Sequence, residues 1–79
     1  MPRYFFSVHD DRSEIDTEGK ELTGHAAARL VATNMASEIL REEAYHSKHG
    51  EAWYLEVADE AGKIVCHVDV SVTTPSAGD

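Results

Sequence analysis

The chain has 79 residues, 42% of them hydrophobic, which is enough for one small domain with an apolar core of limited size. Fifteen acidic residues outnumber seven basic ones and give a formal net charge of -8. The basic residues are scattered singly, so the chain lacks the Lys/Arg clusters with which proteins bind nucleic acid or anionic membranes, and neither partner is expected.

The lack of a recognisable targeting segment and the single cysteine both favour the cytoplasm. The chain does not open with a charged and then apolar leader, and none of its apolar runs approaches the roughly 20 residues of a membrane span. Its single cysteine, Cys66, cannot form an internal disulfide and lacks the companions of a structural zinc site. We therefore expect a soluble cytoplasmic protein.

The N-terminal half begins with two predicted strands. Residues 3–9, RYFFSVH, are rich in aromatic and β-branched side chains and alternate between two faces. Those faces carry Tyr4, Phe6 and Val8 on one side and Phe5, Ser7 and His9 on the other. Residues 14–22 form a weaker, polar strand that belongs at a sheet edge, with Ile15 and Leu22 to bury and Gly19 free to form a bulge.

A helix is predicted from Gly24 to about Lys48. At about 100° per residue, its apolar side chains fall on one stripe. The stripe consists of Ala28, Val31, Ala32, Met35 and Ile39, flanked by Ala36. The opposite side carries Leu30 and Tyr45 and is not uniformly charged, so it is a second candidate contact surface.

Two more strands follow, over residues 52–58 and 63–72. Residues 59–62 predict a tight hairpin turn with Gly62 in the left-handed conformation. Alternation places Trp53, Leu55, Val57, Ile64, Cys66, Val68, Val70 and Val72 on the core face, and Tyr54, Glu56, Val65, His67 and Asp69 on the other. Residues 73–79 are expected to be a disordered C-terminal tail.

This order of elements predicts one α+β domain over residues 1–72, with the topology ββαββ. A four-stranded, mainly antiparallel sheet would carry the long helix packed on one face. Because the helix connects two hairpins, the first and last strands are expected near the centre of the sheet. Ile15 and Leu22 would join the core residues named above.

Four stretches of the chain resemble a known family. They are MPRYFFSVHD, EIDTEGKEL, AAARLVATNMASEIL and VADEAGKIVCHVDV, which together cover most of the chain from Met1 to about Val70. The chain resembles small, uncharacterised bacterial proteins, common in rhizobia and related alphaproteobacteria, that open with MPRYFF. The resemblance implies a domain of unknown function and supports the fold without adding chemistry.

Histidines on the outer sheet face are candidate metal ligands. If their strands are neighbours, His9 and His67 could approach each other together with Asp69. Imidazole nitrogens and a carboxylate are competent ligands for zinc or another divalent ion. The alternative is that all three are ordinary solvated sheet residues, because no ligand-spacing motif accompanies them.

Catalysis is not expected, because the chain has no phosphate-binding loop and no arguable nucleophile and base pair, and no cofactor is implied. The remaining candidates are surfaces. Phe5, Tyr54 and Val65 lie on the predicted open sheet face, and Leu30 and Tyr45 on the outer side of the helix. We expect a protein-interaction or regulatory module with an unknown protein partner or with self-association, such as a homodimer through the open sheet face.

Overall fold

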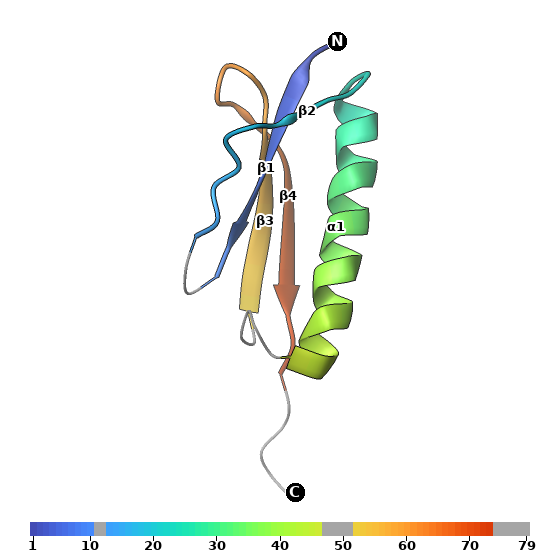
Figure 1. Ribbon diagram of the computed structural model, residues 1–79, viewed down its shortest axis with the longest axis vertical. Helices are drawn as coiled ribbons and strands as arrows, with labels where there is room; N and C mark the ends of the chain where they lie inside the picture. Colours follow the sequence, from blue (N-terminus) through green and yellow to red (C-terminus); the bar gives the residue numbers. More distant parts are fainter. Residues whose placement is uncertain (11–12, 47–51, 74–79) are drawn as a thin grey trace, which may run out of the picture.

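The computed structural model describes residues 1–10, 13–46 and 52–73, with the side chains of residues 45 and 46 outside that description. Its elements are β1 (Arg3–His9), β2 (Lys20–Glu21), α1 (His25–His46), β3 (Ala52–Ala58) and β4 (Ile64–Ser71). The strands form one antiparallel sheet in the order β2-β1-β3-β4, and α1 runs along one face of it (Figure 1). The predicted α+β class and ββαββ topology are confirmed. Of the predicted tail, only residue 73 is described.

The two central strands are β1 and β3, so the prediction that the last strand lies near the centre is wrong. After α1 the chain returns beside β1, where β3 pairs with it from Phe5↔Ala58 to His9↔Tyr54. The following turn is tight, with Gly62 at φ 85°, so β4 can pair only with the free side of β3. This local hairpin places β4 at the sheet edge.

The segment before α1 is far less regular than the strand predicted over residues 14–22. Only Lys20–Glu21 forms a strand, and one further bridge joins Val8 to Glu14. β1 advances four residues from Tyr4 to Val8 while the opposing segment uses six, from Lys20 back to Glu14. The extra residues leave the ladder as a bulge, at which Gly19 adopts φ 73°. Ile15 is carried out of the core and is 61% exposed, which corrects the prediction that it is buried.

The core lies between α1 and the sheet. Its buried members are Tyr4, Phe6, Val8, Ala28, Ala32, Ala36, Trp53, Leu55 and Val57, all of which were predicted. Leu22, Cys66, Val68 and Val70 pack against them. The ends of the last strand are exceptions, because Ile64 and Val72 are 46% and 50% exposed rather than buried.

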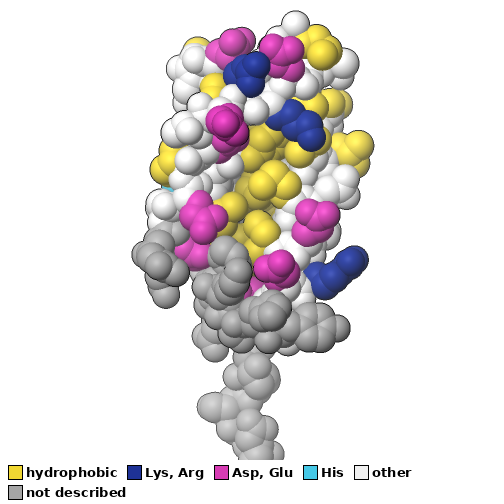
Figure 2. All heavy atoms as spheres, in the orientation of Figure 1, with side chains coloured by type: hydrophobic (Ala, Val, Ile, Leu, Met, Phe, Trp, Pro, Cys, Tyr) yellow, Lys and Arg dark blue, Asp and Glu magenta, His cyan; other side chains and the backbone are white. Residues whose placement is uncertain are grey.

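Three alanines four residues apart bring α1 close to the sheet. Ala28 and Ala32 are fully buried and Ala36 is 7% exposed. Because alanine is small, the helix backbone can approach β3 and β4, against which α1 mainly packs. The opposite flank of α1 is left open as a hollow of about 430 Å³ against the segment around Ile15 (Figure 2). Apolar side chains, among them Val31 and Met35, line this hollow.

Candidate functional site

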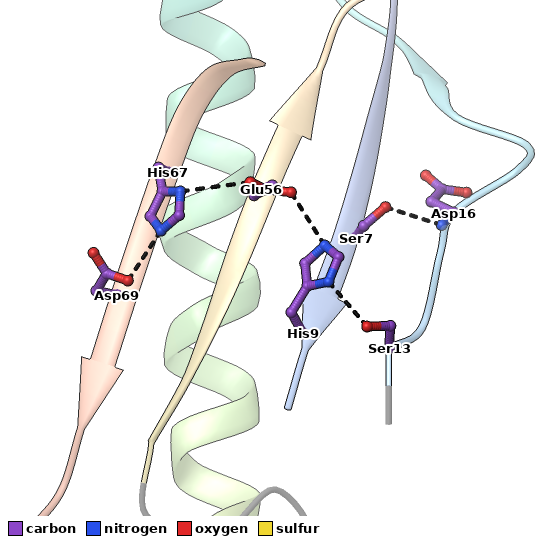
Figure 3. Close-up of polar contacts among 7 residues, drawn as sticks. All are labelled: Ser7, His9, Ser13, Asp16, Glu56, His67 and Asp69. Atoms are coloured by element: carbon purple, nitrogen blue, oxygen red, sulfur yellow. Dashed lines mark hydrogen bonds and ion pairs between the residues drawn. The ribbon is translucent and has the colours of Figure 1, made fainter. Parts of the chain in front are cut away.

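The face of the sheet turned away from α1 carries the polar and aromatic side chains of three strands. Alternation on β1, β3 and β4 puts His9, Tyr54, Glu56, His67 and Asp69 on this open face, as predicted. Figure 3 shows four of them, His9, Glu56, His67 and Asp69, with α1 behind the sheet. The register fixes their order, since His9 is opposite Tyr54, Tyr54 is opposite Asp69, and Glu56 is opposite His67.

Three rings form a continuous stack across the open face. The ring of Tyr54 lies between those of His9 and His67, with centroid separations of 4.6 Å and 4.9 Å. The interplanar angles are 14° and 9°, so the rings are nearly parallel. Aromatic pairs at such spacing stabilise one another beyond simple burial. We call His9, Tyr54 and His67 the ring stack.

A single carboxylate ties the two ends of the ring stack together. One oxygen of Glu56, Oε1, is 3.1 Å from Nε2 of His9, and the other, Oε2, is 3.8 Å from Nδ1 of His67. Nδ1 of His9 is 3.1 Å from the hydroxyl oxygen of Ser13. Both nitrogens of His9 therefore have partners, and its side chain is only 17% exposed. These contacts hold the histidines in fixed orientations (Figure 3).

The β4 end of the stack is the accessible end. Nε2 of His67 is 2.9 Å from Oδ1 of Asp69, and the two side chains are 41% and 81% exposed. An open hollow of about 360 Å³ lies where the end of β1, the start of β3 and the end of β4 meet. It is lined by His9, Asp10, Ala52, Trp53, Tyr54, Asp69, Val70 and Ser71. The hollow is thus bordered by the ring stack and by the carboxylates of Asp10 and Asp69.

The predicted metal site is changed by the strand order. His9 and His67 are not on neighbouring strands, because β3 separates them and places the ring of Tyr54 between the imidazoles. Only His67 and Asp69 come together directly. Within the described ranges, no group of three or more His, Cys, Asp or Glu side chains is arranged to hold a metal ion. Metal binding by His9, His67 and Asp69 stays a prediction that this geometry does not support.

The predicted contact residues are not gathered on one surface. Tyr54 is the centre of the ring stack, whereas Phe5 is half-buried beside Gly19. Val65 lies where the β3–β4 register shifts, and it packs against the core. Leu30 is 64% exposed on α1, away from the open face, and the side chain of Tyr45 lies outside the described residues.

Glu56 is the side chain of the candidate site that sequence reasoning missed. Alternation placed it on the open face, but it gains its importance only because β3 lies between β1 and β4. The i, i+2 spacing of Tyr54 and Glu56 on a strand flanked by two histidine-bearing strands was the available signal. This spacing identifies Glu56 only when the order of the strands in the sheet is known.

Comparisons with known proteins place the chain in a family without assigning an activity. No curated protein matches the chain, and no solved structure does. No helix in the described part of the chain has the length and apolar character needed to cross a membrane. A family model described as "Domain of unknown function (DUF6894)" matches residues 3–71, which include every strand and the helix. The chain therefore belongs to the DUF6894 family.

Proposed function

We propose that this protein is a protein-interaction module that binds an arginine-bearing segment of a partner protein on its open sheet face. The observation that carries the proposal is the ring stack flanked by the carboxylates of Glu56 and Asp69. The function is binding without catalysis. The half-buried free thiol of Cys66 is compatible with a reducing cytoplasm as the place of action.

Arginine suits this surface better than other side chains. Its planar guanidinium can lie on an aromatic face while donating two hydrogen bonds to a carboxylate. Because His9 and His67 cover both faces of the Tyr54 ring, the ring face left for a guanidinium is the outer face of His67, whose side chain is 41% exposed and lies beside Asp69. Asp69 is the most accessible of these groups, with 81% of its side chain exposed.

The overall charge of the protein supports a basic partner. A net charge of -8 attracts a cationic segment over a distance of about one Debye length, roughly 8 Å at physiological salt. The same charge disfavours a partner that is itself acidic. Binding should therefore weaken as the salt concentration rises, because salt screens this attraction.

The test is an NMR titration of the protein with a short synthetic peptide containing two arginines. We expect the ring signals of His9, Tyr54 and His67 to shift. Tyr54→Ala removes the ring that supports His67 and should weaken binding by about 3- to 30-fold, which corresponds to the loss of a stacked cation–π contact of roughly 0.5–2 kcal/mol. Asp69→Asn should also weaken it, while Leu30→Ala, on the exposed helix surface, is the matched control that should not.

Peptide controls decide whether arginine is recognised. A lysine version should bind more weakly because an ammonium cannot form the bidentate, stacked contact. A glutamate version should not bind. The proposal fails if the arginine and glutamate peptides bind alike, or if Tyr54→Ala leaves the affinity for the arginine peptide unchanged.

A further inference from the structure

The two edges of the sheet are protected to very different degrees. At one edge β2 has only two residues, Lys20–Glu21, both charged, and a bulge follows them. At the other edge β4 has eight residues, Ile64–Ser71, without Lys, Arg or Pro and with Asp69 as its only acidic residue. Proteins normally blunt exposed edges with short strands, charges, bulges or proline. The one register shift of β4 in the described ladder lies near its start, at Val65, and residues 66–71 pair regularly with β3. This part of the β4 edge, which has no strand partner on its other side among the described residues, is therefore suited to pairing.

The backbone groups available at this edge follow from the ladder. The N–H groups of Phe6 and Val8 point toward the β2 side, so the intervening residues of β1 bond to β3. The same alternation, followed through the paired residues of β1, β3 and β4, means that the backbone N–H and C=O groups of Val68 and Val70 point toward β3. The N–H and C=O groups of His67 and Asp69 then point outward.

The side chains of β4 are self-complementary in one antiparallel register. If two copies pair with Val68 opposite Val68, each His67 stands opposite the other copy's Asp69. Unlike pairs directly across an antiparallel ladder are stabilising, and like charges are destabilising. A register centred one residue earlier places His67 opposite His67. A register centred one residue later places Asp69 opposite Asp69.

We propose that β4 pairs antiparallel with β4 of a second copy, in the register centred on Val68. The two four-stranded sheets then form one sheet of eight strands around a two-fold axis. Both helices lie on one face, and both ring stacks lie on the other. The dimer shares Asp69 with the proposed arginine site, so it is tested in the absence of any peptide. Because each copy carries a charge of -8, salt should strengthen the association by screening the repulsion.

Sedimentation velocity over a range of protein concentrations tests the dimer and its register. The wild-type protein should dimerise, more tightly at high salt. His67→Asp places like charges opposite each other twice per dimer, so it should weaken dimerisation by at least about tenfold. The double variant His67→Asp/Asp69→His exchanges the two groups and should restore it. Leu30→Asp adds the same charge on the outer helix surface and should leave it unchanged.

Cross-linking tests the register without relying on charge. The two Val68 residues would form a non-hydrogen-bonded pair, with Cα atoms about 4.5 Å apart, which suits a disulfide. Val68→Cys in a Cys66→Ala background should therefore give a covalent dimer on oxidation. Val70→Cys in the same background should not cross-link. In the Val68-centred register, position 70 stands opposite position 66 of the other copy, which is alanine in this background.

Three results would overturn the dimer. They are a wild-type protein that stays monomeric at high concentration and high salt, a dimer that His67→Asp does not weaken, and a Val68→Cys variant that does not cross-link. All of these experiments are performed without peptide. Their failure is therefore distinct from a failure of arginine binding.

Discussion

The carboxylate of Asp16 accepts the backbone N–H of Phe6 at 3.0 Å, where a neighbouring strand would otherwise supply a carbonyl. Its other oxygen accepts the N–H groups of Glu18 and Gly19 at 3.0 Å and 3.1 Å. The backbone N–H of Asp16 itself donates to the hydroxyl of Ser7. One side chain thus closes the edge of β1 and organises the bulge that carries Ile15 into solvent.

Removing that carboxylate should destabilise the fold. Asp16→Ala leaves the partly buried N–H of Phe6 and two loop N–H groups without their acceptor. We expect a loss of about 1–3 kcal/mol in the free energy of unfolding, measured by urea denaturation. Glu18→Ala is the matched control, because it removes a carboxylate from the same loop without removing an acceptor of these bonds. Equal losses in the two variants would contradict the role of Asp16.

The same carboxylate makes stability depend on pH in acid. Burial acts to raise the pKa of Asp16, but the N–H groups of Phe6, Gly19 and Glu18 outweigh it and hold the pKa below its ordinary value of 3.8. Because the pKa of Asp16 is lower in the folded than in the unfolded protein, its ionised carboxylate stabilises the fold. This stabilisation is complete above the pKa of the unfolded state and is lost as the pH falls through the pKa of the folded state. The stability difference between wild type and Asp16→Asn should be constant near neutral pH and shrink in acid. A difference that stays constant throughout the acid range would refute this.

The elements that the sequence predicts well are those with their own strong periodicity. β1 and β3 have the predicted bounds, and α1 buries the predicted alanine stripe, because each pattern reflects local geometry. The order of the strands depends instead on which distant segments pair. The segment around Ile15 was misjudged because a side chain, Asp16, replaces part of the backbone ladder there.

The candidate site was predictable only in part for the same reason. Alternation placed His9, Tyr54 and His67 on one face, and that prediction required only the period of two. Which rings touch and which carboxylate joins them depends on β3 lying between the other two strands. The sequence therefore predicts the members of the open face but not the ring stack.

The ring of Tyr54, and not its hydroxyl, should hold the ring stack together. Tyr54→Ala removes two stacked contacts and should cost about 1–2 kcal/mol of folding free energy. Tyr54→Phe keeps the ring and should stay within about 0.5 kcal/mol of wild type. Ring-current shifts of the His9 and His67 protons in NMR spectra should persist in Tyr54→Phe and vanish in Tyr54→Ala. A Tyr54→Phe variant as unstable as Tyr54→Ala would assign the effect to the hydroxyl.

The close approach of α1 to the sheet should not tolerate a larger side chain. Ala32 is fully buried, so Ala32→Leu forces the helix away from β3 and β4 and should destabilise the protein by about 1–3 kcal/mol. Ala26→Leu makes the same change at an exposed position of α1 and should be nearly neutral. Thermal unfolding measures both. An Ala32→Leu variant as stable as Ala26→Leu would show that the interface has room to spare.

Gly19 should be the glycine least able to accept a side chain, for two separable reasons. Its φ of 73° is left-handed, and a Cβ would lie 2.8 Å from Cγ of Arg3 and 2.9 Å from Cε2 of Phe5. Gly62 has a similar φ of 85° but open space around it. Gly62→Ala should therefore cost only the conformational penalty of about 1–2 kcal/mol, and Gly19→Ala should cost clearly more. Urea denaturation measures the free energy of unfolding of both variants. The difference between the two losses is the cost of the contact with Arg3 and Phe5. Equal losses would mean that these two side chains move aside freely.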